Sequence, residues 1–305
     1  MTILVTGGAG FIGSHIVEHF HTTADVLVLD SLRSGFQSNI DPFKVRFIHG
    51  SITDASLVND IMKGVDHVFH LAALVSVPES MEKPREAVEI NVQGTLHILE
   101  AARACKVKKV VISSSAAIYG DSPVVPKIEE MPPAPKSPYA ISKLDGEFYC
   151  RMFTAEGGLQ TVCLRYFNVF GPRQNPRSQY AAAVPIFIAR AVRNEPITIY
   201  GDGRQTRDFI YVKDIAAANA FFAMQSPATG VFNVACGRRI TINDLAAEIC
   251  RLTGSRSEIR HADSRPGDIQ HSIAATDKLN AAGFTPGSGF PEALQATIEF
   301  FKPGA

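Results

Sequence analysis

The sequence predicts an α/β protein with a doubly wound parallel sheet and a smaller, discontinuous C-terminal region. Three observations support this prediction. The chain has 305 residues and is 46% hydrophobic, so it can bury a large core. Short strand-like runs alternate with helical patterns through its first half, which is typical of parallel sheets. A glycine-rich turn joins the first of these strands to the first helix.

That turn has glycine at every third position. Residues 2–5 are apolar and are typical of a buried strand, and a helical pattern follows from His15, with Gly7, Gly10 and Gly13 between them. Glycine lets the backbone bend tightly and approach a pyrophosphate, and the N-terminus of the next helix then faces the phosphates. The turn therefore predicts a Rossmann-type dinucleotide site.

Asp30 ends the second strand, residues 25–29, about twenty residues after the glycine turn. An acidic side chain at this place can accept hydrogen bonds from both ribose hydroxyls, and it repels a 2′-phosphate. The sequence therefore favours NAD as the cofactor. Arg33 lies close enough to offset part of that repulsion, so NADP use remains an alternative.

The later elements follow in the same alternating order. Strands are expected at residues 45–49, 68–72, 110–114 and 161–167, and helices at 57–62, 86–104 and 139–153. After Gly171 we expect a helix at 185–193 and a strand at 197–200 outside the first sheet. Strands at 208–212 and 231–234, with a helix at 214–224, would return to it, and further helices begin with 241–252. We predict one cofactor domain, residues 1–167 plus about 206–235, and one substrate domain, about 168–205 plus 236–305.

Composition argues against several classes of partner. Thirty basic and thirty acidic residues give a net charge of zero, without a basic stretch that contains aromatic residues, so we expect no nucleic acid and no membrane surface as partners. No apolar run approaches the roughly twenty residues that span a bilayer, and we expect a cytoplasmic protein. The five cysteines are widely spaced and are typical of reduced core residues. His15 and His19 have the spacing of metal ligands but lack a partner motif, so no metal is expected.

Tyr139 and Lys143 lie one helical turn apart and can reach one site. A phenol has a pKa near 10, and a neighbouring ammonium with a bound NAD⁺ ring would lower it; a shift of about three units corresponds to roughly 4 kcal/mol. By itself this pair is common on surface helices. Here the preceding strand ends in serines at the edge where such sheets bind ligands, and Ser115 could contact the same substrate hydroxyl as Tyr139.

The glycine turn, Asp30, Asn91, the serine run, Tyr139 and Lys143 together resemble the extended short-chain dehydrogenase/reductase family. Residues 165–172, 201–203, 207–209 and 265–268 resemble its nucleotide-sugar branch, especially the UDP-glucose/UDP-galactose 4-epimerases, including the type that acts on UDP-N-acetylglucosamine. The resemblance spans essentially the whole chain. The assignment of uracil as the base of the nucleotide rests on the resemblance alone, so TDP and GDP sugars remain alternatives to UDP.

The resemblance implies a reaction without net redox change. Tyr139, assisted by Ser115, would take the proton from the 4-hydroxyl of the sugar while hydride passes from C4 to NAD⁺. The 4-keto sugar would then rotate and take the hydride back on its other face. Lys143 would bind the nicotinamide ribose and tune Tyr139.

The resemblance also implies a set of contacts for each ligand. Those to the cofactor are Gly7, Gly10, Phe11, Ile12, Gly13, Asp30, Ser31, Ser51, Ile52, Leu71, Ala72, Ala73, Asn91, Ser113, Tyr139, Lys143 and Tyr166. Those to the substrate are Ser76, Ser115, Tyr139, Asn168, Val184, Arg207, Arg265, Asp268 and Ser272. Arg207 and Arg265 would pair with the two phosphates, because a guanidinium matches phosphate oxygens bidentately.

Four departures from family patterns refine this prediction. Ala116 and Ala117 stand where related dehydratases have an acidic pair, so elimination of water lacks its acid and base. Ser51 stands where many relatives have an aspartate that contacts adenine, which leaves Ile52 and Asp54 to shape that pocket. Residues 74–80 lack a lysine common in the galactose-pathway enzymes. Ser272 matches a gatekeeper position, where a small residue leaves room for an N-acetyl group.

We therefore expect an NAD-dependent 4-epimerase of UDP-Glc and UDP-Gal that also accepts UDP-GlcNAc and UDP-GalNAc. One alternative is another nucleotide-sugar dehydratase, decarboxylase or reductase. An alternative of a different class is a non-catalytic dinucleotide sensor, because fold alone does not establish activity. If the usual dimer of the family holds, helices at 86–104 and 139–153 would form a homodimer interface.

Overall fold

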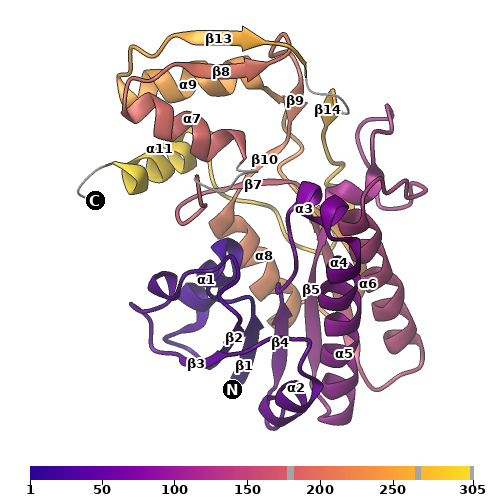
Figure 1. Cartoon of the computed structure of the whole chain (residues 1–305). Helices are drawn as coiled ribbons and strands as arrows, with labels where there is room; N and C mark the ends of the chain where they lie inside the picture. The colour runs from indigo at the N-terminus through magenta and orange to yellow at the C-terminus, as the bar shows by residue number, and fades with distance from the viewer. Residues whose placement is uncertain (177–181, 265–268, 303–305) are drawn as a thin grey trace.

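The computed structural model describes residues 1–176, 182–264 and 269–302. Its centre is a parallel sheet of seven strands in the order β11-β6-β5-β4-β1-β2-β3 (Figure 1), which confirms the predicted doubly wound sheet. These strands are β1 (Thr2–Thr6), β2 (Asp25–Asp30), β3 (Arg46–His49), β4 (His67–His70), β5 (Lys109–Ser115), β6 (Gln160–Tyr166) and β11 (Gly230–Val234).

Helices cover both faces of this sheet, which explains why its inner strands are apolar on both sides. One face packs on α1 (Phe11–Phe20) and α8 (Val212–Met224). The other packs on α2 (Ala55–Ile61), α5 (Gly94–Ala104) and α6 (Pro138–Ala155). The strand order reverses beside β1, which pairs with both β2 and β4. In folds of this type, a ligand crevice opens at this reversal, at the carboxyl ends of the strands.

The helix predicted at 86–104 is not continuous. It consists of α4 (Pro84–Val88), a π-helical stretch η2 (Glu89–Gln93) and α5, and an unpredicted helix α3 (Val77–Glu82) precedes it. The wide turns of η2 include Asn91, whose amide binds both backbone groups of Leu74, at 2.7 Å and 3.0 Å. Such π-helical segments are frequent at functional sites. Through Asn91, the π-helical stretch is thus hydrogen-bonded to the loop that follows β4.

A second core forms beyond the sheet, from α7 (Ala183–Val192), β8 (Ile197–Tyr200), α9 (Ile242–Thr253), β13 (Ile259–Ala262) and α11 (Phe290–Phe301). Figure 1 shows these elements gathered at the end of the sheet where its strands terminate. In the described chain, no helix is long and apolar enough to cross a membrane. The division into two domains at the residue numbers given above stays a prediction.

Three small sheets lie outside the central sheet. They pair β13 with β8, β10 (Phe209–Tyr211) with β7 (Asn168–Phe170), and β12 (Ile240–Thr241) with β9 (Thr206–Arg207) and β14 (His271–Ser272), and α10 (Asp277–Ala281) follows. The strand predicted at 208–212 therefore does not belong to the central sheet; it pairs with β7. The strand predicted at 231–234 does join the central sheet, as β11, and pairs with β6.

Asp208 holds these pieces together. Its buried carboxylate accepts hydrogen bonds from the backbone amides of Cys236 at 3.0 Å, Gly237 at 2.9 Å and Ala274 at 3.2 Å. Burial raises the pKa of this carboxyl, and the amide hydrogen bonds act in the opposite direction. One side chain thus fixes the segments that leave β9, β11 and β14.

Candidate active site

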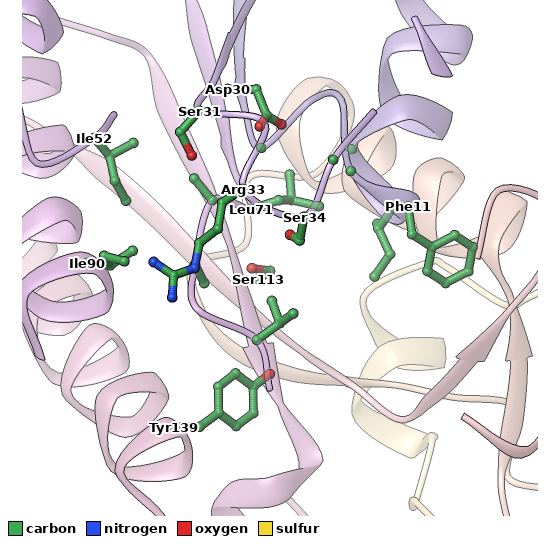
Figure 2. Close-up of a pocket in the computed structure, with 18 of the residues that line it drawn as sticks. Phe11, Asp30, Ser31, Arg33, Ser34, Ile52, Leu71, Ile90, Ser113 and Tyr139 are labelled. Atoms are coloured by element: carbon green, nitrogen blue, oxygen red, sulfur yellow. The ribbon is translucent and has the colours of Figure 1, made fainter. Parts of the chain in front are cut away.

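A cavity of about 820 Å³ lies at the carboxyl ends of the central strands (Figure 2). Most residues predicted to contact a cofactor lie on its wall, although the sequence places them far apart. The predicted residues on the wall are Gly7, Gly10, Phe11, Ile12, Gly13, Asp30, Ser31, Ser51, Ile52, Leu71, Ala72, Ala73, Ser113, Ser115, Tyr139, Lys143 and Tyr166.

The glycine turn has no room for side chains. Gly7 has φ +70°, and a Cβ added there would lie 2.7 Å from the backbone nitrogen of Ala72. A Cβ at Gly13 would lie 2.2 Å from the carbonyl oxygen of Gly7. The turn is therefore packed backbone to backbone and opens to the cavity at the start of α1. These residues fit a dinucleotide, whose pyrophosphate needs this close approach and the amides of a helix N-terminus.

Asp30 joins the glycine turn to the end of β2. Its carboxylate accepts hydrogen bonds from Ala9 N at 2.9 Å and from Leu32 N at 2.8 Å, and it lies on the cavity wall. Each carboxylate oxygen has a further lone pair, so the predicted contact with ribose hydroxyls stays open to it. Asp54, in contrast, caps α2 by accepting from Leu57 N at 3.0 Å, so the structure shows a capping role for it.

The predicted reacting residues meet at the opposite end of the cavity. Tyr139 and Ser115 both lie on the cavity wall, and the Ser115 side chain acts to lower the pKa of Tyr139. Ser115 also accepts from Ala117 N at 3.1 Å, which fixes the serine hydroxyl where β5 ends. Lys143, one turn along α6, donates to the carbonyl oxygen of Ser113 at 2.8 Å. Figure 2 shows the Tyr139 hydroxyl turned toward the cavity, in the direction of Ser113.

Within the chain itself, two opposing effects act on the pKa of Tyr139. Burial raises the pKa of Tyr139, and the Ser115 side chain offsets only part of this effect. Burial also lowers the pKa of Lys143 to about 8, and its ammonium is directed to Ser113. The lowered phenol pKa, which is expected with NAD⁺ bound, therefore stays a prediction.

Asn91 does not lie on the cavity wall. Besides its bonds to Leu74, its amide donates to Ser142 Oγ at 2.9 Å, so its polar groups are used within the protein. Its backbone carbonyl oxygen accepts from Thr95 Oγ1 at 2.6 Å, and because that hydroxyl has one hydrogen, Thr95 accepts from His70 Nε2 at 2.9 Å. Asn91 thus positions the loop after β4 and part of α6.

The buried ring of His70 continues this network to the glycine turn. Its Nδ1 accepts from Thr6 Oγ1 at 2.7 Å, and Thr6 in turn accepts from Ala72 N at 3.3 Å. Burial, with the charge of Lys143, lowers the pKa of His70 to about 3, so the ring is neutral. A neutral ring with one donor and one acceptor satisfies both neighbours. The network links β1, β4 and α5 beneath the cavity.

The predicted substrate residues are only partly brought to the cavity wall. Ser76 caps α3, and Val184 is buried in the second core, whereas Ala182 lies on the wall. Asn168 donates to the carbonyl oxygen of Asp208 at 3.2 Å, close to the cavity residue Val169. Helical periodicity turns Val184 inward with Phe187 and Ile188, which explains its burial.

Arg207 and Ser272 are direct partners in the parallel pair of β9 and β14, although 65 positions separate them in the sequence. They do not line the cavity described above, but both are half-buried. Arg265 and Asp268 lie outside the described residues. The structure thus pairs the predicted gatekeeper with one of the two predicted phosphate ligands.

Sequence reasoning missed several residues of the wall. Gln174 lies on it, donates to the carbonyl oxygen of Val169 at 3.2 Å, and leaves its buried Oε1 without a partner in the described chain. This free acceptor suits a hydroxyl or amide donor of a ligand. Glu86 and Glu89 also lie on the wall. Their spacing of one helical turn places both glutamates on one face of a helix, but only the fold shows that this face lies toward the cavity.

A buried ion pair anchors α6 behind the reacting residues. Arg165 donates to both carboxylate oxygens of Glu147, at 2.8 Å and 2.7 Å, and the two side chains are only 5% and 2% exposed. Arg165 also donates to Tyr119 Oη at 2.7 Å, and Ser114 Oγ donates to Glu147 at 2.6 Å. Burial acts against the charged form of Arg165, but Glu147 raises its pKa above the usual range. The pair thus fixes α6, which carries Tyr139 and Lys143, to β5 and β6.

Comparisons with known proteins agree with this geometry. A model of the NAD dependent epimerase/dehydratase family matches residues 3–235. The structure of a UDP-N-acetylglucosamine 4-epimerase from Methanobrevibacter ruminantium M1, in complex with UDP-N-acetylmuramic acid, is similar with a TM-score of 0.95 and 43% identity, over 98% of this chain and 97% of that chain.

Two further proteins are similar along their whole length. The UDP-glucose 4-epimerase of Thermus thermophilus, in complex with NAD, has a TM-score of 0.91 and 39% identity, over 100% of both chains. The UDP-glucose 4-epimerase of Mycolicibacterium smegmatis is 36% identical over 312 residues, which cover 99% of both. The predicted resemblance and the predicted cofactor, NAD, are confirmed. A parallel sheet with a glycine turn, a tyrosine–lysine helix and a family match over residues 3–235 thus lead to one conclusion: the chain belongs to the NAD dependent epimerase/dehydratase family.

Proposed function

We propose that the protein epimerises UDP-hexoses at C4, and that it accepts UDP-GlcNAc and UDP-GalNAc as well as UDP-Glc and UDP-Gal. The observation that carries the proposal is that Ser115, Tyr139 and Lys143 lie on the wall of one cavity, with Lys143 one turn from Tyr139 on α6. Two hydroxyls at one point suit the removal and return of a proton from a sugar hydroxyl. The names of the similar enzymes support this substrate class.

Each residue of this site has a separate task. Bound NAD supplies a reversible hydride acceptor for C4 of the sugar. With NAD⁺ bound, its positive ring and Lys143 would favour the phenolate of Tyr139; Tyr139 Oη then takes the proton of the 4-hydroxyl and later returns it, and Ser115 holds that hydroxyl in place. Lys143 fixes the strand end at Ser113 and carries positive charge beside the tyrosine ring, with Nζ 5.8 Å from the ring centroid. Gln174 Oε1 offers an acceptor for a further ligand hydroxyl.

The segment after Ser115 argues against elimination of water. It forms the short 3₁₀ helix η3 (Ala116–Tyr119), and its first two residues are alanines. The carboxylates on the cavity wall are Asp30, Glu86 and Glu89, and none of them belongs to this segment. Without an acid or base there, the 4-keto sugar has no partner for dehydration, and return of the hydride remains.

Sugar selectivity provides the direct test. We expect the purified protein, without added reductant, to convert UDP-Gal and UDP-GalNAc to their C4 epimers, as measured by chromatography or NMR. Ser272→Tyr should narrow the substrate range: activity on UDP-GalNAc should fall at least tenfold, about 1.4 kcal/mol, more than activity on UDP-Gal. A bulky ring beside Arg207 removes space that an N-acetyl group needs.

Two outcomes would contradict this proposal. If an excess of the enzyme epimerises UDP-Gal but leaves UDP-GalNAc unchanged, the proposed broad substrate range is wrong. Absence of both epimers, with a net change in NADH absorbance or a keto product, would favour the dehydratase or reductase alternative.

We also propose that the protein is a homodimer. The outer face of α6 exposes Ile141, Phe148 and Met152, whose spacing places them on one side of the helix, and α3 exposes Met81 nearby. Large apolar side chains exposed together on one helix face are typical of an interaction surface. A two-fold axis would let α6 of each copy pack on the same patch of the other.

The expected result is a wild-type mass of two chains and a single-chain mass for Phe148→Glu, measured by light scattering after size-exclusion chromatography. Phe300→Glu is the matched control, because Phe300 is 47% exposed on α11 and Phe148 is 49% exposed. A monomeric wild-type protein, or equal dissociation by both variants, would contradict the proposed interface.

A further inference from the structure

Only two basic side chains lie on the cavity wall among the described residues, Lys143 and Arg33. Lys143 belongs to the end with Tyr139, and Arg33 belongs to the loop that follows Asp30 and β2. An arginine near this strand end is the group that accommodates the 2′-phosphate of NADP in folds of this type. The sequence alone therefore left NADP open, and the outcome depends on what Arg33 contacts.

In the structure the guanidinium of Arg33 is already paired with two carboxylates. Nη2 donates to Glu79 Oε1 at 2.6 Å, and Nη1 donates to Glu86 Oε1. Both pairs raise the pKa of Arg33 and lower the pKa of the two glutamates, while burial opposes these shifts. Lys83 lies 3.4 Å from Glu79 and 3.8 Å from Glu86, so the four side chains form one charge network.

This network crosses the cavity. Arg33 extends from the strand end that carries Asp30 and Ser31 toward Ile90, as Figure 2 shows, and Glu86 lies on the wall it reaches. To serve a 2′-phosphate, Arg33 would have to leave both glutamates. The phosphate would then meet Asp30, Glu86 and Glu89 on the same wall, all of them acidic.

We propose that Glu79 and Glu86 are specificity-determining residues for the cofactor, which select NAD over NADP because they hold Arg33 away from the place of a 2′-phosphate. Asp30 then excludes the 2′-phosphate by repulsion. The two glutamates exclude it because they pair with Arg33, the cation that would otherwise neutralise the phosphate. The inference concerns the cofactor and does not depend on the proposed sugar reaction. It requires only that the cavity is the NAD site.

Each of these pairs is about one-third exposed, with side chains 30–35% accessible, and a single one would hold Arg33 weakly. Two carboxylates on one guanidinium hold it better than either alone. The proposal therefore predicts a larger effect for the double variant than for either single one.

The test measures which dinucleotide the full chain holds. The protein is dialysed to equilibrium against equal concentrations of NAD and NADP, separated from free nucleotide and denatured, and the released dinucleotides are measured by chromatography. Glu79→Gln with Glu86→Gln should raise the NADP:NAD ratio about tenfold, because a released arginine forms a charge-assisted contact with the phosphate. This readout is independent of epimerase activity.

The control separates release of Arg33 from simple loss of charge. Glu89→Gln also removes one carboxylate from the wall, but Glu89 has no ion pair with Arg33 in the structure. It should change the ratio less than about threefold, since an exposed charge acts weakly through water. Adding Arg33→Met to the double variant should abolish the gain. An equal gain in Glu89→Gln, or a gain that persists without Arg33, would overturn the proposal.

Discussion

Replacing Tyr139 with phenylalanine is expected to lower kcat about 10²- to 10⁴-fold, the usual contribution of a positioned acid–base group. Phenylalanine keeps the ring of Tyr139 and loses only its hydroxyl. Steady-state kinetics with UDP-Gal would measure the loss. KM and NAD content should change little, because the hydroxyl acts on the proton of the sugar and not on the cofactor.

Tyr149→Phe is the matched control for this experiment. Tyr149 lies on the same helix, α6, packs against the core and does not belong to the cavity wall. It should keep near wild-type kcat. If Tyr139→Phe keeps full kcat, or loses activity only together with its NAD, the proposed role of Tyr139 as acid and base is wrong.

Replacing Glu147 with glutamine is expected to lower the free energy of unfolding by about 3–5 kcal/mol. The change leaves Arg165 charged and buried without its counter-ion. Glutamine keeps the shape of the side chain, so packing is nearly unchanged and the loss reflects the charge. Urea unfolding followed by circular dichroism would measure it.

The exposed pair of Arg103 and Glu156 gives the control. Its atoms are 2.9 Å apart, similar to the distance in the buried pair, but both side chains are about half exposed. Glu156→Gln should cost less than about 1 kcal/mol, because water screens and replaces this contact. Equal losses of unfolding free energy in the two variants would show that burial does not determine how much the pair of Glu147 and Arg165 contributes to stability.

The sequence predicted the central sheet well because its signals are local. Apolar runs mark strands buried on both faces, and glycine at positions 7, 10 and 13 marks a turn that tolerates no side chain. Six of the seven sheet strands lie before residue 167, where strand and helix alternate regularly. The place of the cavity followed from these local signals, since parallel strands bring their carboxyl ends together, whereas most of its predicted wall residues came from the family resemblance.

The sequence did not predict features that depend on contacts between distant segments. The π-helical stretch arises where Asn91 reaches Leu74, seventeen positions away, and no periodicity reports such a bond. The short strands β9, β12 and β14 have two residues each, too few for a pattern. Arg33 was noted beside the cofactor site, but its pairing with Glu79, 46 positions away, required the fold.

The pair of β9 and β14 has a consequence for how this site changes. The strand that carries Ser272 cannot shift alone: the carbonyl oxygen of Ser272 accepts from Asp208 N at 2.9 Å, and Asp208 also holds Ala274 N with its carboxylate. If Ser272 bounds the sugar site as proposed, the size of one side chain would adjust the space for the sugar while the backbone stays in place. Arg207 shares that backbone pairing, so substitutions at 207 and 272 should be energetically coupled and not additive. If Arg207 also binds the diphosphate, as the resemblance implies, selection for a new sugar would act at the same time on the affinity for the diphosphate.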